Sequence, residues 1–260
     1  MSFAQTVLLA AFAGLTIYLG LPVGRLRNLS ANWQALLTAA AGGVILFLIY
    51  DVLAQAVAPA SAALEASRHG GPLRPFALDA AVLSASVAVG LLSVTYVTSR
   101  LRTRARRGPS LTHELALATA IGLGLHNFSE GLAIGQSSAT GATSLALLLV
   151  VGFALHNATE GFGIAAPLAS GERPSWGLLG LLGLIGGGPT FLGGVVGYLV
   201  VSPLVSIAFL GLAAGALVFV FNEMMAVVRR FSVPMTASTA LLLGLLAGFG
   251  TDFLLTAAGV

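Results

Sequence analysis

Eight apolar stretches, each of about 20 residues or more, constrain the fold of this chain more than any other feature. A helix needs about 20 apolar residues to cross the hydrocarbon core of a bilayer, and most helices of soluble cores are shorter. We therefore expect an all-α polytopic membrane protein with one domain over residues 1–260. The expected spans are 3–24, 33–58, 76–99, 113–137, 144–167, 177–200, 204–228 and 235–258.

The composition supports this class. Hydrophobic residues make up 57% of the chain and charged residues only 8%, against about 25% charged residues in soluble domains. Cysteine is absent, which excludes disulfides and thiolate ligands, so any metal site must use nitrogen and oxygen atoms. The high isoelectric point does not indicate a nucleic-acid partner, because the arginines lie in the loops at the ends of the expected membrane spans. The sequence also contains no phosphate-binding loop for ATP.

The arginines are divided unevenly between the two sides of the expected membrane. The loops after the first, third, fifth and seventh spans hold ten of the 12 basic residues, and the opposite side holds only Arg68 and Arg74. An excess of basic residues marks cytoplasmic loops. This pattern predicts that both termini face outside and that the Arg-rich loop 100–112 is cytoplasmic. The run from Arg100 to Arg107 could also bind anionic lipid or a regulator, although a topology anchor is the simpler interpretation.

One hexapeptide pattern occurs twice, as His-Asn-Phe-Ser-Glu-Gly at 126–131 and His-Asn-Ala-Thr-Glu-Gly at 156–161. Each copy places a histidine four residues before a glutamate, and positions i and i+4 share one face of a helix. Ionisable groups at mid-membrane depth indicate function. Because the copies lie near the centres of consecutive, antiparallel spans, we expect one cage for a divalent cation. Its ligands would be His126, Glu130, His156 and Glu160.

Other interpretations of these polar residues stay open. The histidines and glutamates could hydrogen-bond across helices for packing alone, although two aligned copies favour the metal cage. Asn127 and Asn157 could supply carbonyl oxygens to the same ion or to a neighbouring one, or they could bond the adjacent backbone. Two carboxylates beside neutral imidazoles balance the charge of one divalent ion, which a site of low dielectric requires.

The remaining acidic and histidine residues suggest a path for the ion. Asp51, Asp79 and Asp252 fall toward the outer ends of their spans and could attract cations to an entrance. On the inner side, Glu223, His113 and Glu114 are candidate exit ligands. Each of these residues could equally be an interfacial residue or a helix cap.

Both core motifs, together with the span count and topology, resemble the ZIP (Zrt/Irt-like) family of divalent metal transporters, in its bacterial type. The resemblance implies a 3+2+3 helix arrangement with inverted pseudo-symmetry, divalent metal uptake and a homodimer. It maps His126, Glu130, His156 and Glu160 onto the main metal site of the family. Asn127 and Asn157 map onto its second subsite.

The chain departs from the family pattern at three places. Ser129 and Thr159 stand where the family usually has proline. Gly188 stands where the sixth span often carries a glutamate that binds a second metal. Ile45 is the best match for a methionine ligand that some members have in the second span. The absence of a carboxylate at Gly188 predicts one central ion, and a Gly188→Glu substitution is expected to allow a second.

These observations predict transport of a divalent transition metal into the cytosol across the bacterial inner membrane. Zinc is the first candidate ion, and the ligand types also suit iron, manganese, cadmium, cobalt and nickel. We expect a transporter and not an enzyme, without an organic cofactor. The alternative is an intramembrane metal-dependent hydrolase, but the ligand set leaves no spare general base. A metal-sensing receptor would need a sizeable output domain outside the membrane.

Overall fold

The computed structural model describes residues 1–27, 29–104, 111–170 and 173–257, except for the side chains of residues 101–104, 111, 148, 155, 156, 170, 254 and 255. Within these ranges the chain is helical and forms no strand. The eight α-helices are α1 (Phe3–Leu15), α2 (Ala31–Arg68), α3 (Arg74–Arg104), α4 (Leu111–Ala139), α5 (Thr143–Ala165), α6 (Trp176–Leu199), α7 (Pro203–Arg229) and α8 (Pro234–Ala257). Short 3₁₀ helices follow α1 at Thr16–Leu19 (η1) and Leu21–Arg25 (η2), and α5 at Ala166–Ser170 (η3).

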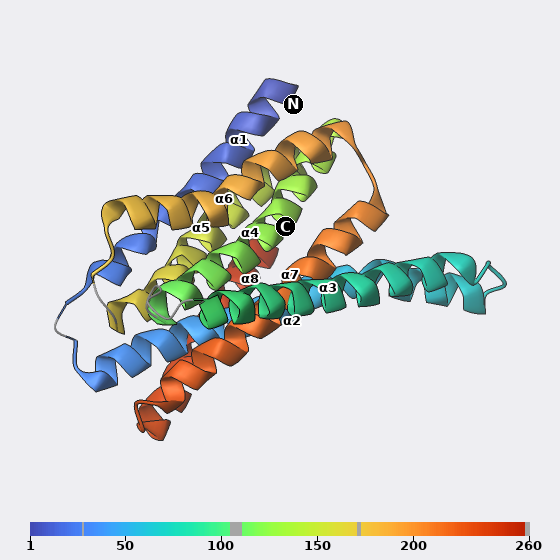
Figure 1. Ribbon diagram of the computed structural model, residues 1–260. Helices are drawn as coiled ribbons and strands as arrows, with labels where there is room; N and C mark the ends of the chain where they lie inside the picture. Colours follow the sequence, from blue (N-terminus) through green and yellow to red (C-terminus); the bar gives the residue numbers. More distant parts are fainter. Residues whose placement is uncertain (28, 105–110, 171–172, 258–260) are drawn as a thin grey trace.

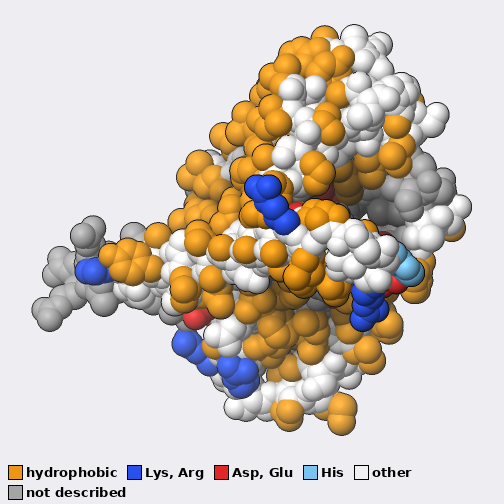
Figure 2. Space-filling view, turned by 90° about the vertical axis from the view of Figure 1, so that its right-hand side faces the viewer, with side chains coloured by type: hydrophobic (Ala, Val, Ile, Leu, Met, Phe, Trp, Pro, Cys, Tyr) orange, Lys and Arg blue, Asp and Glu red, His pale blue; other side chains and the backbone are white. Residues whose placement is uncertain are grey.

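Seven helical segments among the described residues are long and apolar enough to cross a membrane. This finding is consistent with an integral membrane protein. The outer surface is also compatible with a membrane environment, because it exposes large apolar side chains. Leu8, Leu19 and Phe253, for example, are 70%, 73% and 66% exposed. Figure 2 shows hydrophobic side chains over much of one face, with arginines in a few separate groups.

The helix outside that set of seven is α4, which carries the first hexapeptide. Polar residues such as His126, Asn127 and Glu130 lower its hydropathy. Most of α4 is buried, and it packs against α5, α6 and α7. Its polar side chains are therefore surrounded by protein, which is where ionisable residues in membrane proteins are stable.

The observed helices agree with the expected spans except at two places. The first span is not one α-helix, because α1 ends at Leu15 and the chain continues as 3₁₀ turns. Pro22 cannot donate a backbone hydrogen bond, and Gly20 lies so close to α5 that a Cβ would collide with the backbone of Ala158 and Phe162. The second helix is longer than the expected 33–58, because its alanine-rich continuation to Arg68 favours helix beyond Pro59.

The extended part of α2 pairs with α3. Figure 1 shows the two helices side by side, ending in a turn that projects from the remaining helices. Gly70 forms this turn with a φ of 92°, a backbone conformation that glycine adopts without strain. The tip carries an exposed charge cluster, in which Glu65 pairs with Arg68 and His69.

The other close pairs are α1 with α6, α2 with α7 and α8, α3 with α7, and α4 with α5, α6 and α7. Small residues allow these contacts. At the crossing of α1 and α6, a Cβ on either Gly14 or Gly187 would collide with the carbonyl oxygen of the other. Such backbone contact between helices is typical of membrane proteins, where packing and not water exclusion drives association. The crossing holds α1 and α6 together beside the hexapeptide helices, where α6 packs against α4 and α1 packs against α5.

Candidate metal centre

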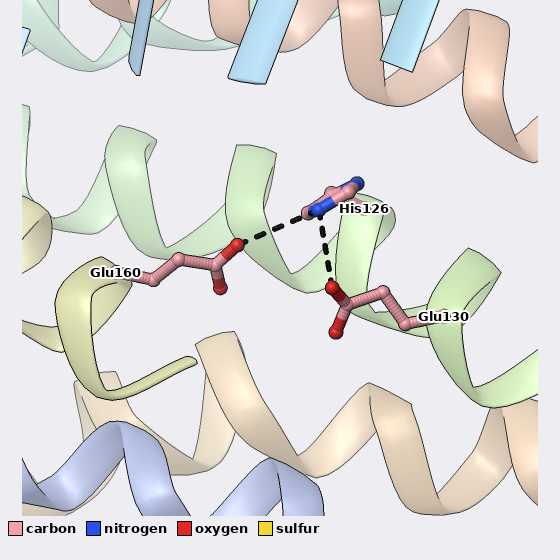
Figure 3. Close-up of side chains that lie close together, drawn as sticks. All are labelled: His126, Glu130 and Glu160. Atoms are coloured by element: carbon pink, nitrogen blue, oxygen red, sulfur yellow. Dashed lines mark ion pairs between the residues drawn. The ribbon is translucent and has the colours of Figure 1, made fainter. Parts of the chain in front are cut away.

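Three side chains of the two hexapeptides meet in the interior. His126 and Glu130 come from successive turns of α4, and Glu160 comes from α5; all three point toward one another (Figure 3). The Nε2 atom of His126 lies 3.5 Å from an oxygen of Glu130 and 3.5 Å from an oxygen of Glu160. One ligand atom from each residue lies within 4.8 Å of the others. The predicted convergence of these three residues is therefore present in the structure.

The burial of this group indicates that it needs a positive charge. His126, Glu130 and Glu160 are only 2%, 5% and 0% exposed. Two carboxylates in such surroundings are costly unless a cation or protons balance them. A proton on His126 could balance one carboxylate, and a divalent ion could balance both.

The distances between the ligand atoms fit a metal ion. In a tetrahedral site with bonds of about 2.0–2.1 Å, the ligand atoms are about 3.3–3.4 Å apart. The two separations of 3.5 Å from the imidazole nitrogen are close to this value. They are longer than the 2.7–2.9 Å typical of a charge-assisted hydrogen bond. Imidazole and carboxylate are also the ligand types that suit zinc and similar ions.

The two asparagines hold the site against its neighbouring helices. The Asn127 amide donates to the carbonyl oxygen of Gly186 on α6 at 3.0 Å. The Asn157 amide donates to the carbonyl oxygen of Ala13 on α1 at 3.1 Å and to Glu130 at 3.4 Å. Both side chains are fully buried. The amide nitrogens of Asn127 and Asn157 therefore bond the backbone of neighbouring helices, which is the second of the two roles considered for them from the sequence.

The side-chain carbonyl oxygens of the same asparagines differ from the amide nitrogens in their hydrogen bonding. In the described part of the chain, the Oδ1 atoms of Asn127 and Asn157 are buried and accept no hydrogen bond. A buried acceptor without a partner is costly, and a cation beside it would remove that cost. The other interpretation, in which these oxygens face an ion, is thus compatible with the amide hydrogen bonds.

The Ala13 carbonyl explains part of this geometry. It lies in the last turn of α1 and accepts the backbone N–H of Thr16, the C-cap residue. Two side chains donate to it as well, the Asn157 amide at 3.1 Å and the Thr16 hydroxyl at 2.7 Å. The end of a helix also carries a partial negative charge, which favours a nearby cation. The sequence did not reveal the roles of the Ala13 and Gly186 carbonyls.

His156, the fourth predicted ligand, lies on α5 one turn before Glu160, and its side chain is outside the described residues. Its part in the site stays a prediction.

The candidate entrance residues differ in their relation to the site. Asp51 on α2 interacts electrostatically with His126 and Glu130 and also with Asp252 on α8. Gln55 donates a hydrogen bond to Asp51 at 2.8 Å. Asp51 is therefore near enough to both Asp252 and the candidate metal centre to act on their charges. Asp79 lies in the second turn of α3 and is partly buried; its place in an entrance stays a prediction.

The candidate exit residues lie on two helices. His113 and Glu114 are in the first turns of α4, about 20 Å along the helix from His126. They line a mostly apolar cavity of about 520 Å³ between α3, α4 and α6. Glu223 lies near the end of α7 and is partly buried. Their role as exit ligands stays a prediction.

Gly188 is not placed as the sequence suggested. A Cβ at this position would meet only the side chain of Leu184 within 4 Å, and Leu184 is 62% exposed. The buried face of α6 is formed by neighbours such as Gly186, Gly187 and Thr190. A glutamate at 188 would therefore start away from the metal centre, and the expectation that Gly188→Glu completes a second central site is wrong for this geometry.

The chain matches no protein-family model and no curated protein sequence.

Proposed function

We propose that this protein carries a divalent transition-metal ion, with zinc as the first candidate, across a membrane through the centre formed by His126, Glu130 and Glu160. The observation that carries the proposal is the convergence of these three fully buried ligands from two helices. A binding centre in the middle of a helical membrane protein is typical of transporters, since an ion must leave water and be coordinated on its way.

The packing of the helices supports an inverted repeat in a 3+2+3 arrangement. An inverted repeat would relate α1, α2 and α3 to α6, α7 and α8, in that order. Under this symmetry the contact between α2 and α8 corresponds to the contact between α7 and α3. Both pairs pack closely. The asparagines follow the same exchange, since Asn127 on α4 bonds α6 and Asn157 on α5 bonds α1. Repeats of this kind place substrate sites at their interface, and α4 would be the eighth span.

The direction of transport follows from the arginines. The ten-to-two division of basic residues favours cytoplasmic placement of the 100–112 loop and outward termini. With this orientation, Asp252 and Asp51 lie on the path of an ion from the outside to the candidate metal centre. Uptake into the cytosol is therefore the expected direction. The resemblance to bacterial ZIP proteins adds an inner-membrane location and a homodimer to this proposal.

The hydrolase alternative gains no support from the geometry. A metal-dependent hydrolase needs a carboxylate beside the metal that acts as a base toward bound water. Here Glu130 and Glu160 both point at His126 as members of the ligand group itself (Figure 3).

A flux measurement in proteoliposomes tests the proposal. Wild-type protein should move Zn²⁺ into vesicles down its gradient, and Glu160→Gln should lose this flux because it removes one ligand charge at constant shape. Glu65→Gln is the matched control, since Glu65 is exposed at the α2–α3 tip. Zinc flux by a folded Glu160→Gln protein equal to that of the wild type would disprove the transport site. Peptide or ester cleavage without flux would favour the hydrolase.

A further inference from the structure

A groove of about 500 Å³ lies between the end of α7 and the start of α8. Its walls are apolar and include Met225 and Val228 from α7 and Ala237 and Leu241 from α8. Arg229 and Ser232 also line it. The groove is within the size range of small-molecule sites, and nothing in the transport proposal uses it.

The depth of the groove is fixed by the helices that form it. Arg229 ends one candidate membrane span and Pro234 begins the next. The charged end of the groove therefore lies at the boundary between hydrocarbon and water, and its apolar walls extend toward the hydrocarbon. A ligand that fits must combine a polar head with an apolar chain.

The charge at this boundary is positive, and no carboxylate in the described part of the chain pairs with it. Arg229 itself is exposed. Arginine recognises phosphate oxygens through paired donors. The arginine-rich side of the chain is also the side on which cytoplasmic leaflets carry anionic lipid.

Ser232 provides a second, independent observation. Among the described residues it is the one non-glycine residue with a positive φ, at 53°. This left-handed conformation is unfavourable for a residue with a Cβ, and glycine is the usual choice after a helix end. A residue kept in a strained conformation suggests that its side chain has a use. Here Ser232 lines the groove together with Arg229.

We propose that this groove binds an anionic phospholipid. The phosphate lies against the Arg229 guanidinium and the Ser232 hydroxyl, and an acyl chain lies along Met225, Val228 and Leu241. The bound lipid joins the end of α7 to the start of α8. It also covers Met225, whose side chain packs against Gly42 of α2.

Thermal unfolding in lipid nanodiscs tests the charge requirement. Wild-type protein should unfold at a higher temperature in phosphatidylcholine discs that contain phosphatidylglycerol than in pure phosphatidylcholine. Arg229→Gln should lose most of this increment. Arg68→Gln, which removes the same charge at the opposite end of the molecule, should keep it. An unchanged increment in Arg229→Gln would overturn the proposal, and so would an equal increment from inorganic phosphate without anionic lipid.

The strained serine gives a sharper second test. Ser232→Gly relieves the left-handed strain and should raise the unfolding temperature in pure phosphatidylcholine, by about 2–4 °C. The same variant should show a smaller phosphatidylglycerol increment than the wild type, because the hydroxyl is gone. A variant that is stabilised in both lipids by equal amounts would show that Ser232 takes no part in lipid binding.

Native mass spectrometry tests the place of the acyl chain. Ala237→Phe fills the groove while Arg229 remains, so this variant should retain less phosphatidylglycerol than the wild type. If Ala237→Phe and Arg229→Gln both retain as much phosphatidylglycerol as the wild type, the lipid lies elsewhere and the proposal is overturned. If lipid retention instead follows dimer formation, the groove is a contact between two copies of the chain and the proposal fails.

Discussion

At the scale of single residues, Asn157 connects its own helix, α5, to two further helices at the candidate site. Its amide bonds the last turn of α1 through the Ala13 carbonyl and also reaches the Glu130 carboxylate on α4. One side chain of α5 thereby joins three helices at the metal centre. The Asn127 amide makes the corresponding bond to α6. The bond from Asn157 therefore restrains the Glu130 carboxylate at the candidate centre.

Replacing Asn157 by alanine should lower stability. The change removes both amide hydrogen bonds and leaves the Ala13 carbonyl and the Glu130 carboxylate with one donor fewer in a buried place. A loss of this kind costs about 1–3 kcal/mol, which corresponds to a fall of several degrees in the unfolding temperature. Thermal unfolding in detergent measures it. Asn222→Ala is the control, because Asn222 is exposed; equal losses in both variants would contradict the bridging role.

His126 should be required for stabilisation by zinc. An ion that binds only the folded protein stabilises it by about 2.7 kcal/mol when its concentration is 100 times the dissociation constant. His126→Ala removes the nitrogen that lies 3.5 Å from both carboxylates and should abolish most of the zinc-dependent rise in unfolding temperature. His69→Ala, at the exposed tip, should leave it unchanged. A full zinc response in His126→Ala would show that the ion binds elsewhere.

At the scale of helices, the site depends on how closely α1 and α6 approach. Gly14 and Gly187 bring the two backbones into contact, and the carbonyls of Ala13 and Gly186 beside them accept from the two asparagines. The glycine-rich sequence of α6 is thus explained by its neighbours. It forms one continuous helix through Pro189, although Gly186-Gly187-Gly188-Pro189 could equally have been read as a break.

Alanine substitutions on glycines separate packing from helix propensity. Gly14→Ala places a methyl group against the Gly187 carbonyl and should destabilise the protein by about 1–3 kcal/mol through overpacking. Gly180→Ala on α6 meets nothing within 4 Å and should instead stabilise the protein by about 0.5–1 kcal/mol, since alanine is the better helix former. Unfolding temperatures of the two variants should therefore move in opposite directions. Movement in the same direction would refute the close α1–α6 contact.

The sequence predicted the helices well because membrane spans depend on length and apolarity alone. It predicted the meeting of His126, Glu130 and Glu160 because the i,i+4 spacing and the antiparallel order leave few other arrangements. It failed where the outcome depends on neighbouring helices. The 3₁₀ turns after Leu15 follow from the close approach of Gly20 to α5, and the outward position of Gly188 follows from the rotation of α6 about its axis. Neither is encoded in a local pattern.

At the scale of the whole molecule, the arginine distribution makes a prediction about orientation. The chain has no cysteine, so single cysteines can be introduced without background. A cysteine at Ser2 should react with an impermeant thiol reagent added to whole cells, and a cysteine at Thr103 should react only after the membrane is opened. The reverse pattern would invert the proposed direction of transport.

The number of ions per molecule follows from the charges at the centre. Two divalent ions about 4 Å apart repel each other by about 16 kcal/mol at an effective dielectric of about 20. Glu130 and Glu160 can balance one such ion, Asn127 and Asn157 are neutral, and Gly188 lies away from the site. Any further ion should bind weakly near Asp51 and Asp252, which interact with each other on the side that we propose faces outward.

We therefore expect one zinc ion per chain after weakly bound metal has been removed by desalting. Elemental analysis by mass spectrometry should give this ratio for the untagged wild type and for Asp51→Asn, and a ratio near zero for Glu160→Gln. The Asp51 variant is the informative control, because it removes the nearest further carboxylate on the proposed path without touching the ligand group. Two strong central peaks in anomalous diffraction from zinc-soaked crystals would contradict the single-ion centre. That result would mean that the carbonyl oxygens of Asn127 and Asn157, together with Asp51, offset more repulsion than their charges suggest.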